Sequence, residues 1–189
     1  MQILRRAGYR QMPWKNGQGL TEEVLTFPEG STVDAFDWRI SIAHVGADGP
    51  FSLFPGIDRT IALLDGAGLI LDLPDETEQL LSPGGKPFAF PGEWDISSRN
   101  VDGGTMDLNI MTRRGRATHR LTRQRLEAGA ALIASTTTVL IVNAPATLDA
   151  SGVAISLQRF EGLLISSGEM IAATGSGADC LVAELFAAA

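Results

Sequence analysis

The chain has 189 residues, of which 44% are hydrophobic and 20% charged, a balance typical of a globular protein with one large domain or two small fused ones. A net charge of −7 disfavours nucleic acid as a partner, because such proteins neutralise phosphates with a basic surface. One cysteine excludes an internal disulfide and indicates a reducing compartment. Arginines interrupt the apolar start that a signal peptide needs, and no apolar run reaches the roughly 18 residues of a membrane helix. We therefore expect a cytoplasmic protein with no nucleic-acid or membrane partner.

The first half of the chain carries clear β patterns. Residues 38–45 alternate between apolar and polar, which predicts a strand with Arg39 and Ser41 on one face and the tryptophan and isoleucines on the other. Further on, the apolar runs 61–64 and 69–73 flank a glycine-containing turn, and this arrangement predicts a β-hairpin.

A second alternating strand is expected at residues 107–111, with Asp107 and Asn109 on a common face. Helical periodicity is weak throughout, and the best helical candidates are short: residues 3–10 and the tail near Leu185.

The second half repeats short apolar runs separated by turn residues, which predicts further strands. These runs cover residues 138–142, 153–157, 162–165, 170–171 and 180–186. Twenty-one glycines and nine prolines supply the turns that so many short strands require. The sequence therefore predicts an all-β fold, either a sandwich or a barrel.

Polar residues gather in a glycine-rich stretch near the N-terminus and on the two alternating strands, which predicts a polar site on a β scaffold. Arg39 and Lys15 suit a ligand carboxylate, because a guanidinium binds it with two hydrogen bonds and an ammonium adds charge. Asn16 and Asn109 offer both donors and acceptors to the nitrogen end of a ligand, and Trp14 offers a flat wall. The candidate ligand-binding residues are Trp14, Lys15, Asn16, Thr21, Arg39, Ser41, Asp107 and Asn109.

Structural roles for the charged residues stay open at this point. Asp107 with Arg39, or Asp58 with Arg59, can equally be ion pairs that tie loops together, and this structural reading is stronger for the second pair because it follows a turn. Likewise, the arginine-rich segment 113–125 either binds phosphate or an acidic partner or is a solvated linker.

The common catalytic and metal motifs are missing from the sequence. Its two histidines, His44 and His119, are 75 positions apart, and Cys180 has no nearby partner. No Gly-x-Ser-x-Gly elbow or phosphate-binding loop is present. We therefore expect no metal and no cofactor.

Several of these motifs together resemble the HutD/Ves family. The matching segments are Met12-Pro-Trp-Lys-Asn-Gly17 with Gly19 and Thr21, Trp38-Arg-Ile-Ser41, Asp48-Gly-Pro-Phe-Ser52, Phe54-Pro-Gly-Ile-Asp-Arg59, Leu63-Leu-Asp-Gly-Ala-Gly68 and Asp107-Leu-Asn-Ile-Met111 with Arg113. Two positions depart from the family pattern: Gln18 stands where a third glycine is usual, and Glu93-Trp94 where a Gly-Asp pair is common.

The resemblance implies an all-β, cupin-like fold (RmlC-like jelly roll), more closely a bicupin of two fused β-barrel halves. We assign the halves to residues 1–114, which carry the expected site, and 115–189, packed as one compact unit. A faint internal echo agrees with a duplication, since the pattern at residues 80–92 recurs at 163–175. Metal cupins carry histidines just before the turn at residues 65–68, and this chain has none there.

HutD members are encoded with enzymes of histidine degradation, and Ves members are linked to cold response. The resemblance therefore implies a non-metal binding or regulatory protein, more an accessory protein than an enzyme, that senses a small anionic intermediate: urocanate, formiminoglutamate or formate. One alternative is an isomerase or hydrolase for a small carboxylate, with Lys15 or Asp107 transferring the proton. Another is an interaction module without a pocket. Exposed sheet edges make a homodimer plausible.

Overall fold

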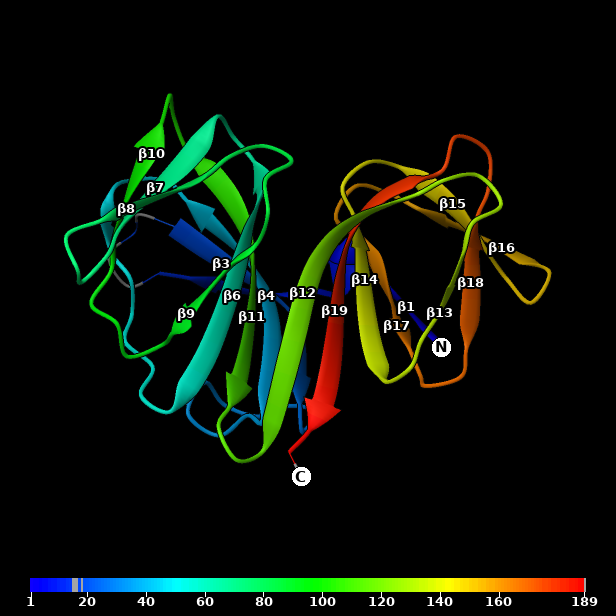
Figure 1. Ribbon diagram of the computed structural model, residues 1–189, viewed down its shortest axis with the longest axis horizontal. Coiled ribbons are helices and arrows are strands. Elements are labelled where there is room, and N and C mark those ends of the chain that lie inside the picture. Colours follow the sequence, from blue (N-terminus) through cyan, green and yellow to red (C-terminus); the bar gives the residue numbers. More distant parts are fainter. Residues whose placement is uncertain (15–16, 18, 189) are drawn as a thin grey trace. The chain divides into compact units, whose positions relative to one another are not determined.

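A computed structural model describes residues 1–14, 17 and 19–188, which form two compact β units (Figure 1). One unit comprises residues 9–118 with 187–188 of the described tail, and the other comprises residues 1–8 with 119–186. Each unit is built from two antiparallel sheets. No helix among the described residues is long and apolar enough to cross a membrane.

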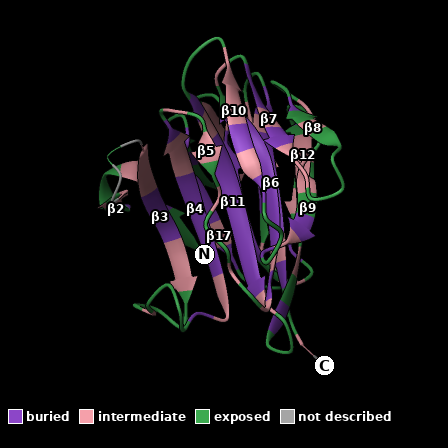
Figure 2. Ribbon diagram, turned by 90° about the vertical axis from the view of Figure 1, so that its left-hand side faces the viewer, coloured by how far each residue is buried: buried purple, intermediate pink, exposed green. Residues whose placement is uncertain are grey.

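The unit of residues 9–118 contains a six-stranded sheet in the order β2-β3-β4-β11-β6-β9 and a four-stranded sheet in the order β5-β10-β7-β8. Its strands are β2 (Arg10–Pro13), β3 (Gly19–Phe27), β4 (Trp38–Val45), β5 (Gly49–Pro50), β6 (Ile57–Asp65), β7 (Gly68–Asp72), β8 (Glu78–Leu81), β9 (Phe88–Pro91), β10 (Ser97–Val101) and β11 (Thr105–Arg113). Figure 2 shows that β11 and β6, at the centre of the larger sheet, are buried along almost their whole length.

The other unit contains a five-stranded sheet in the order β1-β17-β14-β19-β12 and a four-stranded sheet in the order β13-β18-β15-β16. Its elements are β1 (Gln2–Leu4), the 3-10 turn η1 (Arg6–Gly8), β12 (Ala117–Leu126), β13 (Ala131–Ile133), β14 (Thr137–Val142), β15 (Ala146–Ala150), β16 (Val153–Leu157), β17 (Gly162–Ile165), β18 (Met170–Ala173) and β19 (Ala178–Ala187). Its core cluster contains only apolar side chains and the buried thiol of Cys180.

The prediction of an all-β fold is confirmed, but three local predictions are wrong. Residues 3–10 form no helix beyond the short turn η1, because β1 pairs with β17 and β2 pairs with β3. The tail at Leu185 lies inside β19, where it pairs with Thr137. Residues 61–73 do not form a hairpin either, since β6 and β7 belong to different sheets and the turn between them carries the chain from one sheet to the other.

The predicted boundary between residues 114 and 115 falls in the turn that joins β11 to β12, and the division into barrel halves 1–114 and 115–189 stays a prediction. Nearby, the arginine-rich segment makes ion pairs with carboxylates. Arg114 contacts Asp58 at 2.7 Å and Glu93 at 2.6 Å, and Arg120 contacts Glu184 at 2.6 Å.

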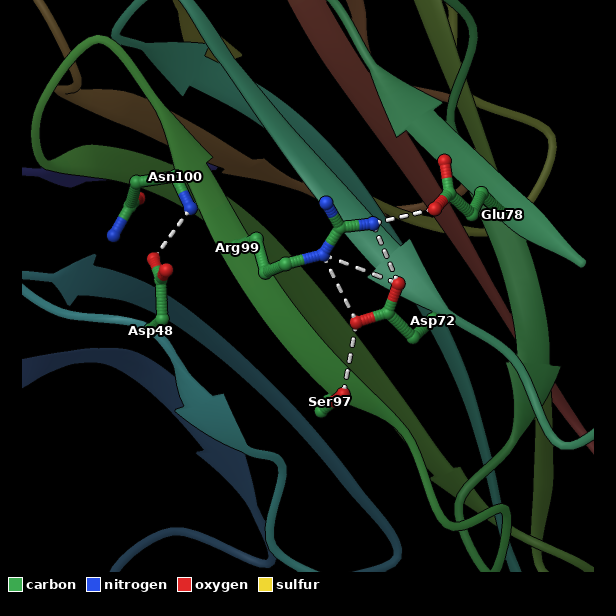
Figure 3. A network of polar contacts seen from close by, with 6 residues as sticks. All are labelled: Asp48, Asp72, Glu78, Ser97, Arg99 and Asn100. Carbon is green, nitrogen blue, oxygen red and sulfur yellow. Dashed lines mark hydrogen bonds and ion pairs between the residues drawn. The ribbon is translucent and has the colours of Figure 1, made fainter. Parts of the chain in front are cut away.

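A polar network joins strands on the outer side of the four-stranded sheet β5-β10-β7-β8 (Figure 3). Arg99 on β10 donates to Asp72 on β7 at 2.8 Å and to Glu78 on β8 at 2.6 Å. Hydrogen bonds from Arg99 and Ser97 hold the pKa of Asp72 below its usual range. The backbone nitrogen of Asn100 donates to Oδ1 of Asp48 at 2.8 Å. Since these side chains are largely solvated, Arg99 is a suitable surface control for variants of buried arginines.

Candidate functional site

One face of the six-stranded sheet looks toward the four-stranded sheet of the same unit. Ile61 and Leu63 on β6 pack with Leu69 and Leu71 on β7 in one buried cluster. Residues directly opposite each other in antiparallel strands point to the same side of the sheet. The register therefore identifies the other residues on this side, which we call the inner face.

Besides Thr105, which lies opposite Val45 near its end, the inner face carries six buried polar side chains in the described residues. Asn109 on β11 lies opposite Ser41 on β4 and opposite Ile61 on β6. In each of these strands, residues two positions away point to the same side of the sheet. None of the six side chains belongs to a residue more than 9% exposed. They are Glu23 on β3, Arg39 and Ser41 on β4, Arg59 on β6, and Asp107 and Asn109 on β11.

Arg39 is held by a carboxylate from the adjacent strand. Its Nε donates to Oε2 of Glu23 at 2.8 Å, and both side chains are buried, with 6% and 9% exposed. Arg10 lies 3.8 Å from the other oxygen of Glu23 and is mostly exposed. The Glu23–Arg39 pair therefore compensates its own charges within the buried face.

Arg59 is enclosed by aromatic rings. Its guanidinium carbon lies 5.1 Å from the ring centre of Phe51, 5.4 Å from that of Phe54 and 5.0 Å from that of Phe90. Its Nη1 donates to the backbone oxygen of Ser52 at 3.3 Å. Burial lowers the pKa of Arg59 to about 10, against the opposing effect of a nearby carboxylate, so the guanidinium stays charged near neutral pH.

Three inner-face atoms are buried without a hydrogen-bond partner among the residues that the structure describes. They are Nε of Arg59, Oδ2 of Asp107 and Oδ1 of Asn109, and we call them the open atoms. A buried polar atom without a partner costs about 1–3 kcal/mol, so a ligand that supplies the partner recovers this energy.

Burial also raises the pKa of Asp107 to about 7, while the charge of Arg59 acts in the opposite direction. Its carboxyl group therefore gains or loses a proton near neutral pH. This is the property expected of a group that responds to a bound charge or transfers a proton.

The glycine-rich stretch adds a wall beside the inner face. Nε1 of Trp14 donates to Oγ1 of Thr21 at 2.9 Å, and Trp14 packs against the apolar cluster that contains Ile61. Thr21 lies opposite Ala43, which lies opposite Asp107, so Thr21 shares the inner face. Lys15 and Asn16, predicted to bind a ligand, lie outside the described residues.

Gly19 is required by the position of Trp14. A Cβ atom at this residue would lie 2.5 Å from the backbone oxygen of His44 and 2.6 Å from a ring carbon of Trp14. We expect Gly19→Ala to lower the free energy of unfolding by about 1–3 kcal/mol, as for other overpacked sites, and to displace the indole ring. Denaturant titration checks the stability, and tryptophan fluorescence checks the ring. A variant with unchanged stability and fluorescence would contradict this close contact.

A hollow of about 710 Å³ lies at the end of β3, β4 and β11 and includes His44 in its lining. Nε2 of His44 lies 2.7 Å from Oε1 of Glu22, on the sheet face opposite the inner face, as predicted from the alternation of residues 38–45. Among the six predicted ligand-binding residues that the structure describes, none lines this hollow. Four of these six, Arg39, Ser41, Asp107 and Asn109, are buried on the inner face instead.

The inner face does not fit the metal that many cupin-like proteins hold. It presents two guanidinium groups, and among residues 1–14, 17 and 19–188 no group of three metal-binding side chains gathers anywhere. His44 points to the opposite side of the sheet from Arg39 and Asp107. Glu23 already pairs with Arg39, which leaves the guanidinium of Arg59, with its open Nε, as the group suited to an anion.

The structure brings together four of the predicted residues, and it adds two that the sequence analysis did not select. Arg39, Ser41, Asp107 and Asn109 are joined by Glu23 and Arg59.

The suggested partnership of Asp58 with Arg59 is wrong, since Asp58 accepts a hydrogen bond from Arg114 at 2.7 Å. Adjacent residues of a strand point to opposite faces, and Arg59 is in phase with the buried Ile61 and Leu63. This alternation of Arg59 with Ile61 and Leu63 is the sequence pattern that predicts an arginine on the inner face.

The described chain matches known proteins along nearly its whole length. A family model described as HutD matches residues 6–182. An uncharacterised 21.2 kDa protein of Pseudomonas putida, located in the hutC 3′ region, is 35% identical over 187 residues, which are 96% of each chain. HutD from Pseudomonas fluorescens SBW25, solved in a formate condition, is 31% identical with a TM-score of 0.82, and the match covers 100% of this chain and 99% of that one.

A more distant likeness identifies the fold. A cupin 2 conserved barrel domain protein from Leptotrichia buccalis is 9% identical, with a TM-score of 0.64 over 96% of this chain and 99% of that one. The fold is therefore cupin-like, as the sequence predicted. The bicupin arrangement stays a prediction.

Proposed function

Because the chain belongs to the HutD family, we propose that it is a binding protein that senses a small anionic intermediate of histidine catabolism. The observation that carries this proposal is Arg59, a buried guanidinium whose Nε is one of the open atoms. Its aromatic surroundings exclude water, which strengthens its attraction for a carboxylate.

The remaining inner-face groups suit the other end of such a ligand. Oδ1 of Asn109 is an acceptor, and Oδ2 of Asp107 is one while that carboxyl group is ionised, so an N–H or O–H group of the ligand can be their partner. Arg39 adds positive potential, although Glu23 already receives its Nε hydrogen bond. Arg59 therefore takes the direct carboxylate contact that the sequence analysis assigned to Arg39, with Lys15 a further candidate.

Three anions are the first to test: urocanate, formiminoglutamate and formate. Histidine breakdown is suggested by the relative from Pseudomonas putida, which lies in the hutC 3′ region, and by the family name. The formate condition of the Pseudomonas fluorescens structure makes formate a simple probe. A cytoplasmic location is part of the proposal, because the single cysteine, Cys180, is a free thiol and suits a reducing compartment.

A thermal-shift titration tests the proposal. A ligand at 100 times its dissociation constant adds about 2.7 kcal/mol of stability. For a chain of this size we expect the unfolding midpoint to rise by about 5–11 °C, since each kcal/mol is worth about 2–4 °C. Chloride at equal ionic strength controls for general salt effects. If none of the three anions raises the midpoint beyond this control, the anion-sensing function is wrong.

Asp107 favours a second candidate, an isomerase or hydrolase for a small carboxylate. A carboxyl group with a pKa of about 7 is matched to proton transfer near neutral pH. This function predicts turnover of one of the three anions by the purified protein, followed by absorbance or NMR, and loss of turnover in Asp107→Asn. Binding without turnover leaves the sensing function.

A further inference from the structure

The charges buried on the inner face cancel one another only as long as nothing else binds there. The four buried charged side chains in the described part of this face are Glu23, Arg39, Arg59 and Asp107. Two are positive, and two are negative when Asp107 is ionised. A bound anion would therefore leave one negative charge in excess.

The four charged side chains form two pairs that differ in how closely their members approach each other. Glu23 and Arg39 are in direct contact at 2.8 Å. Arg59 and Asp107 instead make no hydrogen bond or ion pair with each other among the described residues, and their charges interact through space. Asp107 is therefore the negative group whose compensation depends on Arg59 and is lost when Arg59 engages an anion.

Few charged groups face Asp107 in the described part of the chain. From the sheet itself, the charged groups that face it are Glu23 on β3 and Arg39 on β4, tied to each other, and Arg59 on β6. Arg10 on β2 approaches Glu23 and is mostly exposed. The facing sheet contributes Leu69 and Leu71 on β7, Leu81 on β8 and the uncharged Ser98 on β10 in the described part of the chain. Apolar side chains from β9, the loops and Ile96 complete the surroundings: Phe88, Phe90, Phe51 and Trp14.

We propose that an anion binding at Arg59 is taken up together with one proton, which Asp107 holds while the anion is bound. The proposal rests on the proposed anion-binding function and adds its regulation by pH. The proton comes from the solvent and forms an O–H bond on the Asp107 carboxylate, while the ligand stays a carboxylate. The buried charges then cancel again, and the neutral carboxyl group can donate a hydrogen bond to the bound anion.

The direction of the pH dependence follows from the pKa of Asp107, which burial raises to about 7. Below pH 7 the empty site already holds the proton, so the anion binds at full affinity. Above pH 7 the site must take up the proton, and the affinity falls. We expect the dissociation constant to rise about tenfold from pH 6 to pH 8, because binding then carries the full cost of protonation.

Isothermal titration of the full chain with formate, at pH 8 in HEPES and in Tris, measures the protons taken up. The two buffers release a proton with different heats, so their difference gives the number directly. We expect about one proton per formate at pH 8 and almost none at pH 5.5. If formate binds equally at pH 6 and 8 with no buffer difference, the coupling is wrong and the anion site remains. If formate does not bind at either pH, the same titration is made with urocanate and formiminoglutamate, and both proposals are wrong if none of the three anions binds.

Asp107→Asn is the matched variant, because its amide imitates the neutral carboxyl group in size. We expect its affinity for formate to be the same at pH 6 and pH 8 and the variant to take up no proton on binding. Equal pH dependence in this variant would assign the coupling to another group and overturn the role of Asp107. If the variant does not fold, the two-buffer measurement on the original protein decides alone.

Discussion

Replacing Arg39 with alanine should lower the free energy of unfolding by about 3–5 kcal/mol, because it leaves the buried carboxylate of Glu23 without its partner. Urea titration followed by circular dichroism measures the loss. This result would assign Arg39 to the scaffold, since Glu23 receives the Nε hydrogen bond at 2.8 Å.

The double variant Glu23→Leu/Arg39→Met separates loss of the pair from loss of packing. Apolar side chains of similar volume often replace a buried ion pair without cost, so we expect this variant to recover most of the stability. If Arg39→Ala instead keeps its stability and no longer responds to ligand, Arg39 binds the ligand carboxylate, as the sequence predicted.

Replacing Arg59 with glutamine should weaken anion binding at least about thirty-fold. Removing one partner of a buried charged contact costs about 2 kcal/mol or more, and each 1.4 kcal/mol is a factor of ten. Arg59→Lys should weaken binding less, because it keeps the charge but loses the planar group that stacks on Phe51, Phe54 and Phe90. Calorimetric titration with formate measures both variants.

Arg99→Gln is the control for the Arg59 variants. It also removes an arginine from the same unit, but one whose contacts with Asp72 and Glu78 lie on the outer side of the four-stranded sheet. We expect formate to bind this variant as it binds the original protein. If Arg59→Gln binds formate as tightly as Arg99→Gln does, Arg59 does not hold the ligand.

Local patterns in the sequence were sufficient to predict many of the strands and several faces of the sheets, but not β1, β2 or β3. The alternation over residues 38–45 placed Arg39 and Ser41 on one side of β4, and the structure confirms this. The hairpin at residues 61–73 could not be excluded from local pattern alone, because both apolar runs are strands. Their separation into two sheets is decided by β11, which pairs with β6 but lies more than thirty residues further along the chain.

The candidate site was harder to predict, because its composition depends on register. Alternation along β3 alone would place Glu23 and Leu25 on the same face. The pairing of β3 with β4 is irregular between them, so Glu23 lies opposite Ser41 and Leu25 lies opposite Ile40. This β-bulge turns the acid inward and the leucine outward. Arg59 was missed for a different reason: the adjacent Asp58 offered a simpler partner in the sequence.

The pairing of β1 with β17 has a consequence for dissecting the protein. Residues 2–4 complete the edge of a sheet whose other strands come from residues 117–187. A single cut near residue 118 would leave the C-terminal fragment without this strand and expose the backbone of β17 along Gly162–Ile165. The unit of residues 1–8 and 119–186 can therefore not be isolated whole by simple truncation, whereas a fragment in which residues 1–8 follow its C-terminal end keeps the sheet intact.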